Sequence, residues 1–189
     1  MSRPYQTTIQ TVRRQLTASF DALDARFDLP EAVRGYRPAA AAAWRIDDIL
    51  EHVSLTSHYL LIIIRKGVAK ACKRAATQAL PDGESDLQAI EVIGHPDTFA
   101  WLRPDHMEPT RAVTSAAVRV TLRQQRAECL ALLEQMGQGE GSLYTVRMSV
   151  QALGKLDMYQ WLAFLALHAR RHDVEIGRIV AAQQADKPA

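Results

Sequence analysis

The 189-residue chain is 48% hydrophobic and 23% charged, which is ordinary for a globular protein, and it is long enough to form one domain over residues 1–189. Its formal net charge of +2 argues against a nucleic-acid-binding protein. Its longest apolar run, residues 59–64, is too short to span a bilayer, and its first residues lack the apolar core of a signal peptide. Two cysteines, Cys72 and Cys129, fit a reducing compartment. We therefore expect a cytoplasmic protein whose partners include neither nucleic acid nor a membrane.

The first predicted helix covers residues 6–27. Its apolar side chains recur every three or four residues, which is the spacing of one buried helix face: Ile9, Val12, Leu16, Phe20, Leu23 and Phe27. Pro30 disfavours helical geometry in the residue before it, so the helix ends there. Residues 28–43 are expected to form a connection.

A second helix is predicted over residues 45–66. Its apolar stripe also contains a histidine: Ile49, His52, Thr56, Tyr59 and Ile63. His58 follows His52 by six residues, so it points away from this stripe and toward solvent. Gly67 is expected to end this helix or a weaker continuation of it.

A long irregular connection is predicted over residues 67–109. Loops of this length often line a functional site. Near its start lies a basic cluster: Arg65, Lys66, Lys70, Lys73 and Arg74. This cluster either contacts an anionic ligand or partner, or it is simply the solvated end of a helix. Cys72 stands among these charges, which can lower the pKa of a thiol. His95 and His106 occupy turns and are spare candidates for ligands.

Two further helices are predicted over residues 110–136 and 157–182. Asp157 and Gln160 have the spacing of a capping box at the start of the last helix, just after Gly154. Cys129 falls on a buried stripe, where cysteine is usually a small hydrophobe. Four long amphipathic helices, with no clear alternation typical of strands, predict an all-α fold, a four-helix bundle.

The last helix carries two histidines on its buried face. His168 and His172 are four residues apart, which places their Cβ atoms roughly 5–6 Å apart on one side of a helix. Both imidazoles can therefore reach one metal ion. A buried histidine is more often a core residue bonded to a backbone carbonyl, so the pair alone leaves both interpretations open. His52 is a third histidine on a buried face.

Two motifs in this chain resemble the signature of DinB-like proteins. They are Trp44-x4-Ile49-Leu50-x-His52 and Gly154-x-Leu156-x3-Gln160-Trp161-Leu162-x5-His168-x3-His172. The resemblance implies a four-helix bundle, frequently a homodimer, that holds one divalent metal ion on His52, His168 and His172. Relatives often carry glutamine three residues after the last histidine, where this chain has Glu175.

The resemblance also implies an activity. Family members with an assigned activity are transferases and isomerases that use a low-molecular-weight thiol, so we expect a metal-dependent S-transferase that activates such a thiol for attack on a small-molecule electrophile. A hydrolase that uses a metal-bound water, a non-enzymatic metal-binding or ligand-binding stress protein, and a bundle with three unmetallated core histidines are the alternatives. Zinc or nickel is the expected ion, although imidazole ligands also suit copper and iron.

Two carboxylates near the histidines have two interpretations each. Glu175, three residues after His172, either orients an imidazole, joins the ligand set or acts as a base, or it is a solvated partner of Arg171 or Arg178. Asp48, four residues before His52, poses the same choice. Its structural alternative is a negative charge that complements the helix dipole.

Overall fold

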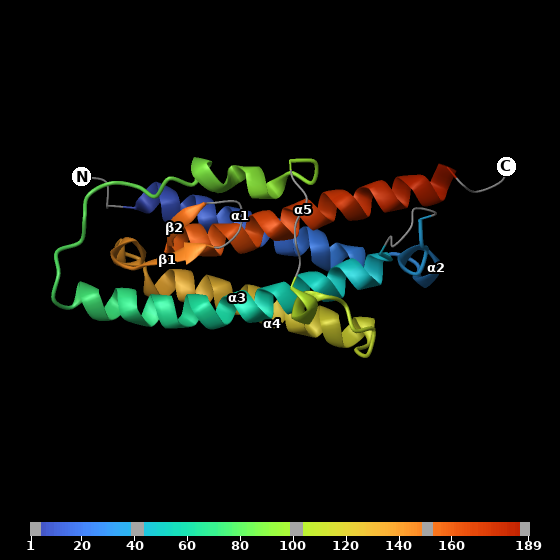
Figure 1. The fold of residues 1–189 in the computed structure, drawn as a ribbon, viewed down its shortest axis with the longest axis horizontal. Helices are drawn as coiled ribbons and strands as arrows, with labels where there is room; N and C mark the ends of the chain where they lie inside the picture. Colours follow the sequence, from blue (N-terminus) through green and yellow to red (C-terminus); the bar gives the residue numbers. More distant parts are fainter. Residues whose placement is uncertain (1–4, 39–43, 99–103, 149–152, 186–189) are drawn as a thin grey trace.

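The computed structural model describes residues 5–38, 44–98, 104–148 and 153–185. Within these ranges the chain is mostly helical with little strand, in agreement with an all-α fold. Four long helices form the body of the molecule (Figure 1): α1 (Gln6–Arg26), α3 (Ile46–Ala75), α4 (Ser115–Gln135) and α5 (Met158–Ala185). Shorter elements join them: α2 (Glu31–Arg34), the 3₁₀ helices η1 (Gln88–Gly94), η2 (Asp105–Met107) and η3 (Glu140–Leu143), and the strands β1 (Thr145–Met148) and β2 (Gly154–Asp157). None of the described helices combines the length and the apolar character that crossing a membrane requires.

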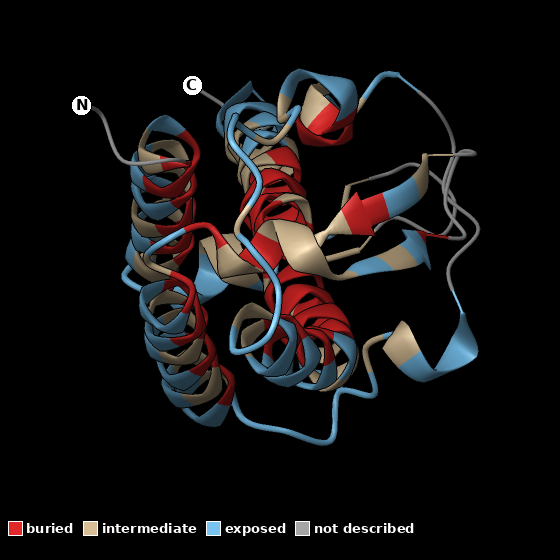
Figure 2. Cartoon of the chain, turned by 90° about the vertical axis from the view of Figure 1, so that its left-hand side faces the viewer, coloured by how far each residue is buried: buried red, intermediate tan, exposed pale blue. Residues whose placement is uncertain are grey.

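The four long helices pack around a shared core. α1 packs against α4 and α5, and α3 packs against the same two helices, so α1 and α3 lie at opposite corners. Helix α5 is the most deeply enclosed of the four (Figure 2), and every residue from 161 to 169 is buried. A polar side chain in that part of α5, such as His168, therefore lies inside the protein.

Helix α3 continues to Ala75, well beyond the predicted end near residue 66. Gly67 does not end it. The lack of a side chain at Gly67 instead lets α3 lie close to the start of α5. A Cβ atom at Gly67 would lie only 2.1 Å from the Met158 sulfur. The connection that follows is therefore shorter than the predicted 67–109, and it contains η1 and η2.

The basic cluster lies along the second half of α3, where part of it makes internal contacts. The Lys70 ammonium lies 3.1 Å from the Tyr144 hydroxyl, and Arg74 donates a hydrogen bond of 2.7 Å to the Leu143 carbonyl. Both cations also lie over the Tyr144 ring. These contacts fasten the end of α3 to the segment η3–β1, which is a structural role for two members of the cluster.

Helix α4 begins at Ser115, later than the predicted residue 110. The Thr114 side chain caps it by accepting a hydrogen bond from the backbone N–H of Ala117. The preceding residues are held elsewhere, because the backbone N–H groups of Thr110 and Arg111 donate to the buried Glu51 carboxylate at 2.9 and 3.0 Å. Glu51 thus ties this part of the connection to α3.

The start of α5 confirms the predicted capping box. The Asp157 backbone N–H donates to Gln160 Oε1 at 3.0 Å, and the Gln160 N–H donates to Asp157 Oδ1 at 2.9 Å. Just before it, β1 and β2 form an antiparallel hairpin in which Thr145 pairs with Asp157. These two strands were not predicted, because each has only four residues, too few for a recognisable alternating pattern. Residues 149–152, between the two strands in the sequence, lie outside the described residues.

The connection between α3 and α4 supports the ends of two other helices. Glu84 accepts hydrogen bonds from the backbone N–H groups of Thr7 and Thr8 at 3.1 and 2.7 Å, in the first turn of α1. The Ser85 hydroxyl donates a hydrogen bond to the Asp157 carboxylate at the start of α5. Burial raises the pKa of the Asp157 carboxyl. The connection between α1 and α3 contains the short helix α2, where we predicted none, and its residues 39–43 lie outside the described part of the chain.

Candidate metal centre

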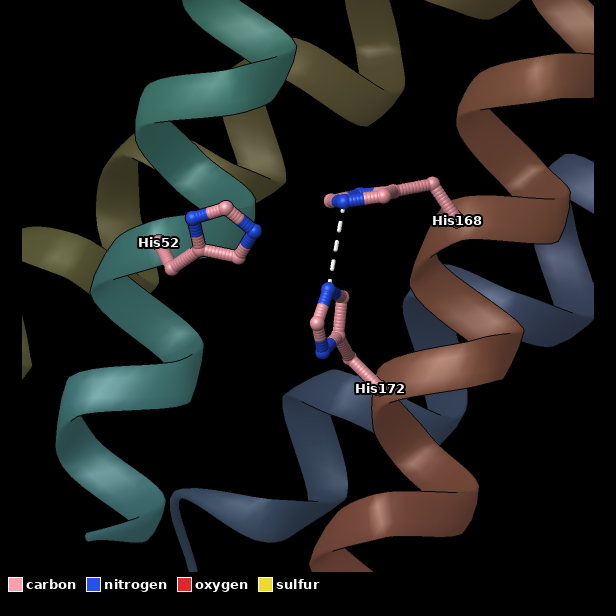
Figure 3. Close-up of side chains that lie close together, drawn as sticks. All are labelled: His52, His168 and His172. Atoms are coloured by element: carbon pink, nitrogen blue, oxygen red, sulfur yellow. Dashed lines mark hydrogen bonds between the residues drawn. The ribbon is translucent and has the colours of Figure 1, made fainter. Parts of the chain in front are cut away.

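Helices α3 and α5 bring three histidines to one point (Figure 3). His52 projects from α3 toward His168 and His172 on α5, and one nitrogen of each ring lies within 4.8 Å of the other two. As whole residues, His52, His168 and His172 are 4%, 3% and 7% exposed, respectively. The convergence of imidazoles from two helices, on which the predicted site depends, is therefore present. No other group of three or more side chains able to hold a metal ion is found among the described residues.

Hydrogen bonds fix the orientation of two of the rings. His52 Nδ1 lies 2.7 Å from the Met107 carbonyl oxygen, and His172 Nδ1 lies 2.7 Å from Glu175 Oε2. A carbonyl and a carboxylate oxygen are both acceptors, so in each ring Nδ1 carries the proton. The lone pair of each neutral ring is then on Nε2, the nitrogen that most often binds a metal when Nδ1 is held in this way.

The third ring, His168, lies beside His172 on the same helix. His168 Nε2 lies 3.1 Å from His172 Nε2. Burial lowers the pKa of His168 well below its usual value, and positive charge on His172, His52 or Arg171 would lower it further. His168 is therefore neutral at neutral pH, which is the form that binds metal. Three imidazoles gathered in this way match the kind of donor set that zinc and nickel accept.

Aromatic rings enclose this donor set. The Trp44 ring lies 4.9 Å from the His52 ring, and the Phe164 ring stacks on His168 at 6.4 Å with an angle of 8° between the ring planes. Rings of this kind exclude water and lower the local dielectric, which strengthens every electrostatic interaction in the centre.

Glu175 makes the contact expected of a residue that orients a ligand. Besides its bond to His172, its carboxylate lies 3.5 Å from Arg171. Both sequence interpretations thus describe a real contact of this side chain. Arg178, the other expected partner, pairs instead with Asp97. Arg171 is buried and donates to the carbonyls of His95 and Pro96, which holds the end of η1 against α5.

Asp48 belongs to the start of α3 rather than to the histidine cluster. Its carboxylate accepts the Arg45 backbone N–H in a capping box and forms ion pairs with Arg45 and Arg111. Burial alone would raise the pKa of Asp48, but hydrogen bonds from Arg45 and Arg111 lower it to about 2. The capping contact agrees with the helix N-terminal interpretation, and the pair with Arg111 also ties the start of α3 to the connection before α4.

The remaining candidates lie outside the cluster. His58, His95 and His106 are exposed. Burial raises the pKa of the Cys72 thiol, so the expectation that nearby lysines lower it is wrong. Burial also raises the pKa of Cys129, to about 12, which agrees with a buried hydrophobic role.

Sequence reasoning missed the groups that support His52. The Met107 carbonyl is a backbone atom, and any residue at position 107 would provide it. Glu51 holds that part of the connection in place through Thr110 and Arg111. A charged residue directly before a buried histidine was the only available signal, and periodicity alone could not show where it points.

Comparison with known proteins leaves the family open. No protein-family model, curated protein or solved structure matches this chain. The assignment of a function must therefore start from the histidine cluster itself.

Proposed function

We propose that His52, His168 and His172 hold one divalent metal ion, zinc or nickel, in a DinB-like four-helix bundle. The observation that carries this proposal is the convergence of three buried imidazoles whose nitrogens lie within 4.8 Å of one another. Two of them already have Nδ1 tied to an acceptor outside the cluster. Like donors gathered in a dry interior are stabilised when a cation binds between them.

We further propose that the protein is a transferase acting with a low-molecular-weight thiol and a small electrophilic substrate. An ion held by these three imidazoles would retain its positive charge and an open position, and there it would lower the pKa of a thiol or of water. The chain contributes the orientation of two ligands through Met107 and Glu175, and it excludes water through Trp44 and Phe164.

The motif residues support the DinB-like proposal by the places they occupy. Trp44 contacts His52, Gln160 caps α5, and Leu50 and Trp161 are buried in the core. These four motif residues therefore contact the cluster or support the helices that carry it. A homodimer belongs to the same proposal and is tested by the molar mass in solution.

An assay of thiol conjugation tests the activity. Purified protein is loaded with zinc or nickel and mixed with monochlorobimane and, in turn, with bacillithiol, mycothiol, glutathione and cysteine. We expect metal-dependent conjugation with at least one thiol, and its loss in His168→Ala. Turnover of ester or amide substrates without any thiol would instead identify a hydrolase, and metal binding without turnover would identify a binding protein.

A further inference from the structure

Thr56 is a buried polar residue in α3, four residues after His52. It is 5% exposed, and within the described part of the chain its hydroxyl oxygen is buried without a hydrogen-bond partner. A threonine inside a helix usually bonds to the carbonyl four residues before it. Thr121 in α4 does so, with a distance of 3.0 Å to the Ala117 oxygen. The Thr56 hydroxyl does not make this bond.

The position of Thr56 on α3 directs it toward the cluster. Four residues after His52, it lies about 40° around the helix, on the same face. Its side chain leans toward the helix N-terminus and thus over the turn that carries His52. The Cβ atoms of such a pair are roughly 5–6 Å apart, a separation that a ligand bound beside His52 can bridge.

The packing of α3 on α5 sets the level of Thr56 along the cluster. His52 meets His168 and His172, whereas Gly67 meets Met158, so the two helices run antiparallel. Moving from His52 toward Gly67 therefore means moving from His172 toward His168. Thr56 lies about one helical turn along this path, on the His168 side of His52.

The neighbouring Ser57 has a buried hydroxyl that points in another direction. Ser57 is 1% exposed, and its hydroxyl likewise has no partner among the described residues. It lies about 140° around the helix from His52, however, and so faces away from the cluster. The two adjacent residues thus differ in direction and share their burial, which makes Ser57 a matched control.

We propose that the Thr56 hydroxyl donates a hydrogen bond to an anionic ligand held at the open position of the metal centre. This inference rests on the proposed metal site and adds a residue that positions whatever binds there. A hydroxyl can donate to an anion, and such a bond is stronger than one between neutral groups. An unpartnered buried hydroxyl is costly in the free protein, and the bound anion gives it a partner.

Azide binding to the cobalt(II)-loaded protein tests the proposal without any assay of activity. The visible spectrum of cobalt reports both metal uptake and the binding of azide to the open position. We expect Thr56→Val to weaken azide binding about tenfold while cobalt affinity stays unchanged. Thr56→Ser, which keeps the hydroxyl, and Ser57→Ala are both expected to bind azide like the wild type.

The stability of the metal-free variants gives a second readout. Valine has nearly the shape of threonine, and it removes a hydroxyl that has no partner. Metal-free Thr56→Val should therefore unfold at the same temperature as the wild type or at a higher one. A lower unfolding temperature would mean that the hydroxyl is already bonded within the fold, and this would overturn the proposal.

The outcomes separate this proposal from the one on which it rests. If the wild type takes up no cobalt, the metal site and the role of Thr56 fail together. If cobalt binds but the wild type binds no azide, or the wild type and Thr56→Val bind azide equally, only the role of Thr56 is overturned. Weaker azide binding in Ser57→Ala as well would also overturn it.

Discussion

Two polar clusters in this molecule are built in opposite ways. Between α1 and α4, Asp24 accepts hydrogen bonds from Arg119 and Arg123 at 2.7 to 3.0 Å, and Asp28 adds a further pair with Arg119. Each charge meets an opposite charge, and these side chains remain partly exposed. This cluster is electrostatically complete, so it needs nothing from outside the chain.

The histidine cluster gathers groups of one kind and buries them more deeply. Its three imidazoles could all bind one metal ion, and Met107 and Glu175 contact the Nδ1 atoms of two of them. A cluster of polar side chains is therefore not by itself a sign of a metal site. Several groups of the same kind that converge in the protein interior are a better sign, because a bound cation stabilises all of them together.

The largest effect that separates the two clusters is stabilisation by metal. Zinc or nickel at one hundred times its dissociation constant should stabilise the wild type by about 2.7 kcal/mol. For a chain of this length that corresponds to roughly 5–10 °C in the unfolding temperature. A thermal melt with and without metal measures it, and His172→Ala should show almost no change. An equal shift in both proteins would place the ion elsewhere.

The pH dependence of the metal-free protein gives the next effect. His168 stays neutral when folded because its pKa is lowered, but in the unfolded chain it takes up a proton below about pH 6.5. The unfolded state then binds more protons, so the free energy of unfolding falls as the pH drops below 6.5, by up to about 1.4 kcal/mol per pH unit. Denaturant unfolding at several pH values between 7 and 5 measures this change, and the free energy of unfolding should depend less on pH in His168→Ala than in the wild type. An identical pH dependence in the two proteins would contradict the buried neutral state of His168.

Glu175 is expected to tune metal binding rather than to create it. Glutamine at this position keeps an oxygen that accepts the His172 Nδ1–H but lacks the negative charge, so Glu175→Gln should weaken metal affinity about tenfold. Competition with a chromophoric chelator measures the affinity. Glu128→Gln is the matched control, since Glu128 pairs with Arg65 and not with a histidine. A loss of metal in the control would mean that the effect is general.

The smallest effect should come from the complete cluster. Hydrogen bonds from Arg123 and Arg119 hold the pKa of the Asp24 carboxyl well below its ordinary 3.8. Asp24→Asn removes this negative charge and should lower the free energy of unfolding by about 1 kcal/mol at neutral pH. This contribution is present above pH 4 and is lost at lower pH, so the two proteins should converge in stability on acidification. Metal affinity should not change. Weaker metal binding in Asp24→Asn would show that the two clusters are coupled.

Much of the helical structure could be predicted from the sequence because long apolar stripes repeat with the helical period. The stripe of α1 and the capping box of α5 are examples, and both are present where expected. The continuation of α3 through Gly67 could not be predicted. The glycine is required by the close approach of Met158, which is a contact of the folded protein and not a local signal. The four-residue strands carry too little pattern for a prediction.

The candidate site was predictable in part for a similar reason. The spacing of His168 and His172 on one helix is local, and the motif around His52 supplied the third residue. The choice between two roles for Asp48 was not local, because it depends on Arg111, far along the chain. The same holds for the Met107 carbonyl, which only the folded connection brings to His52.

Measurement of bound metal tests the central claim most directly. Wild-type protein and His168→Ala are each dialysed against buffer containing micromolar zinc and nickel, and the metal content per chain is then determined by elemental analysis. We predict close to one ion per chain in the wild type and close to none in the variant. A wild type that retains no metal, or a variant that retains as much as the wild type, would contradict the proposal that His52, His168 and His172 form a metal centre.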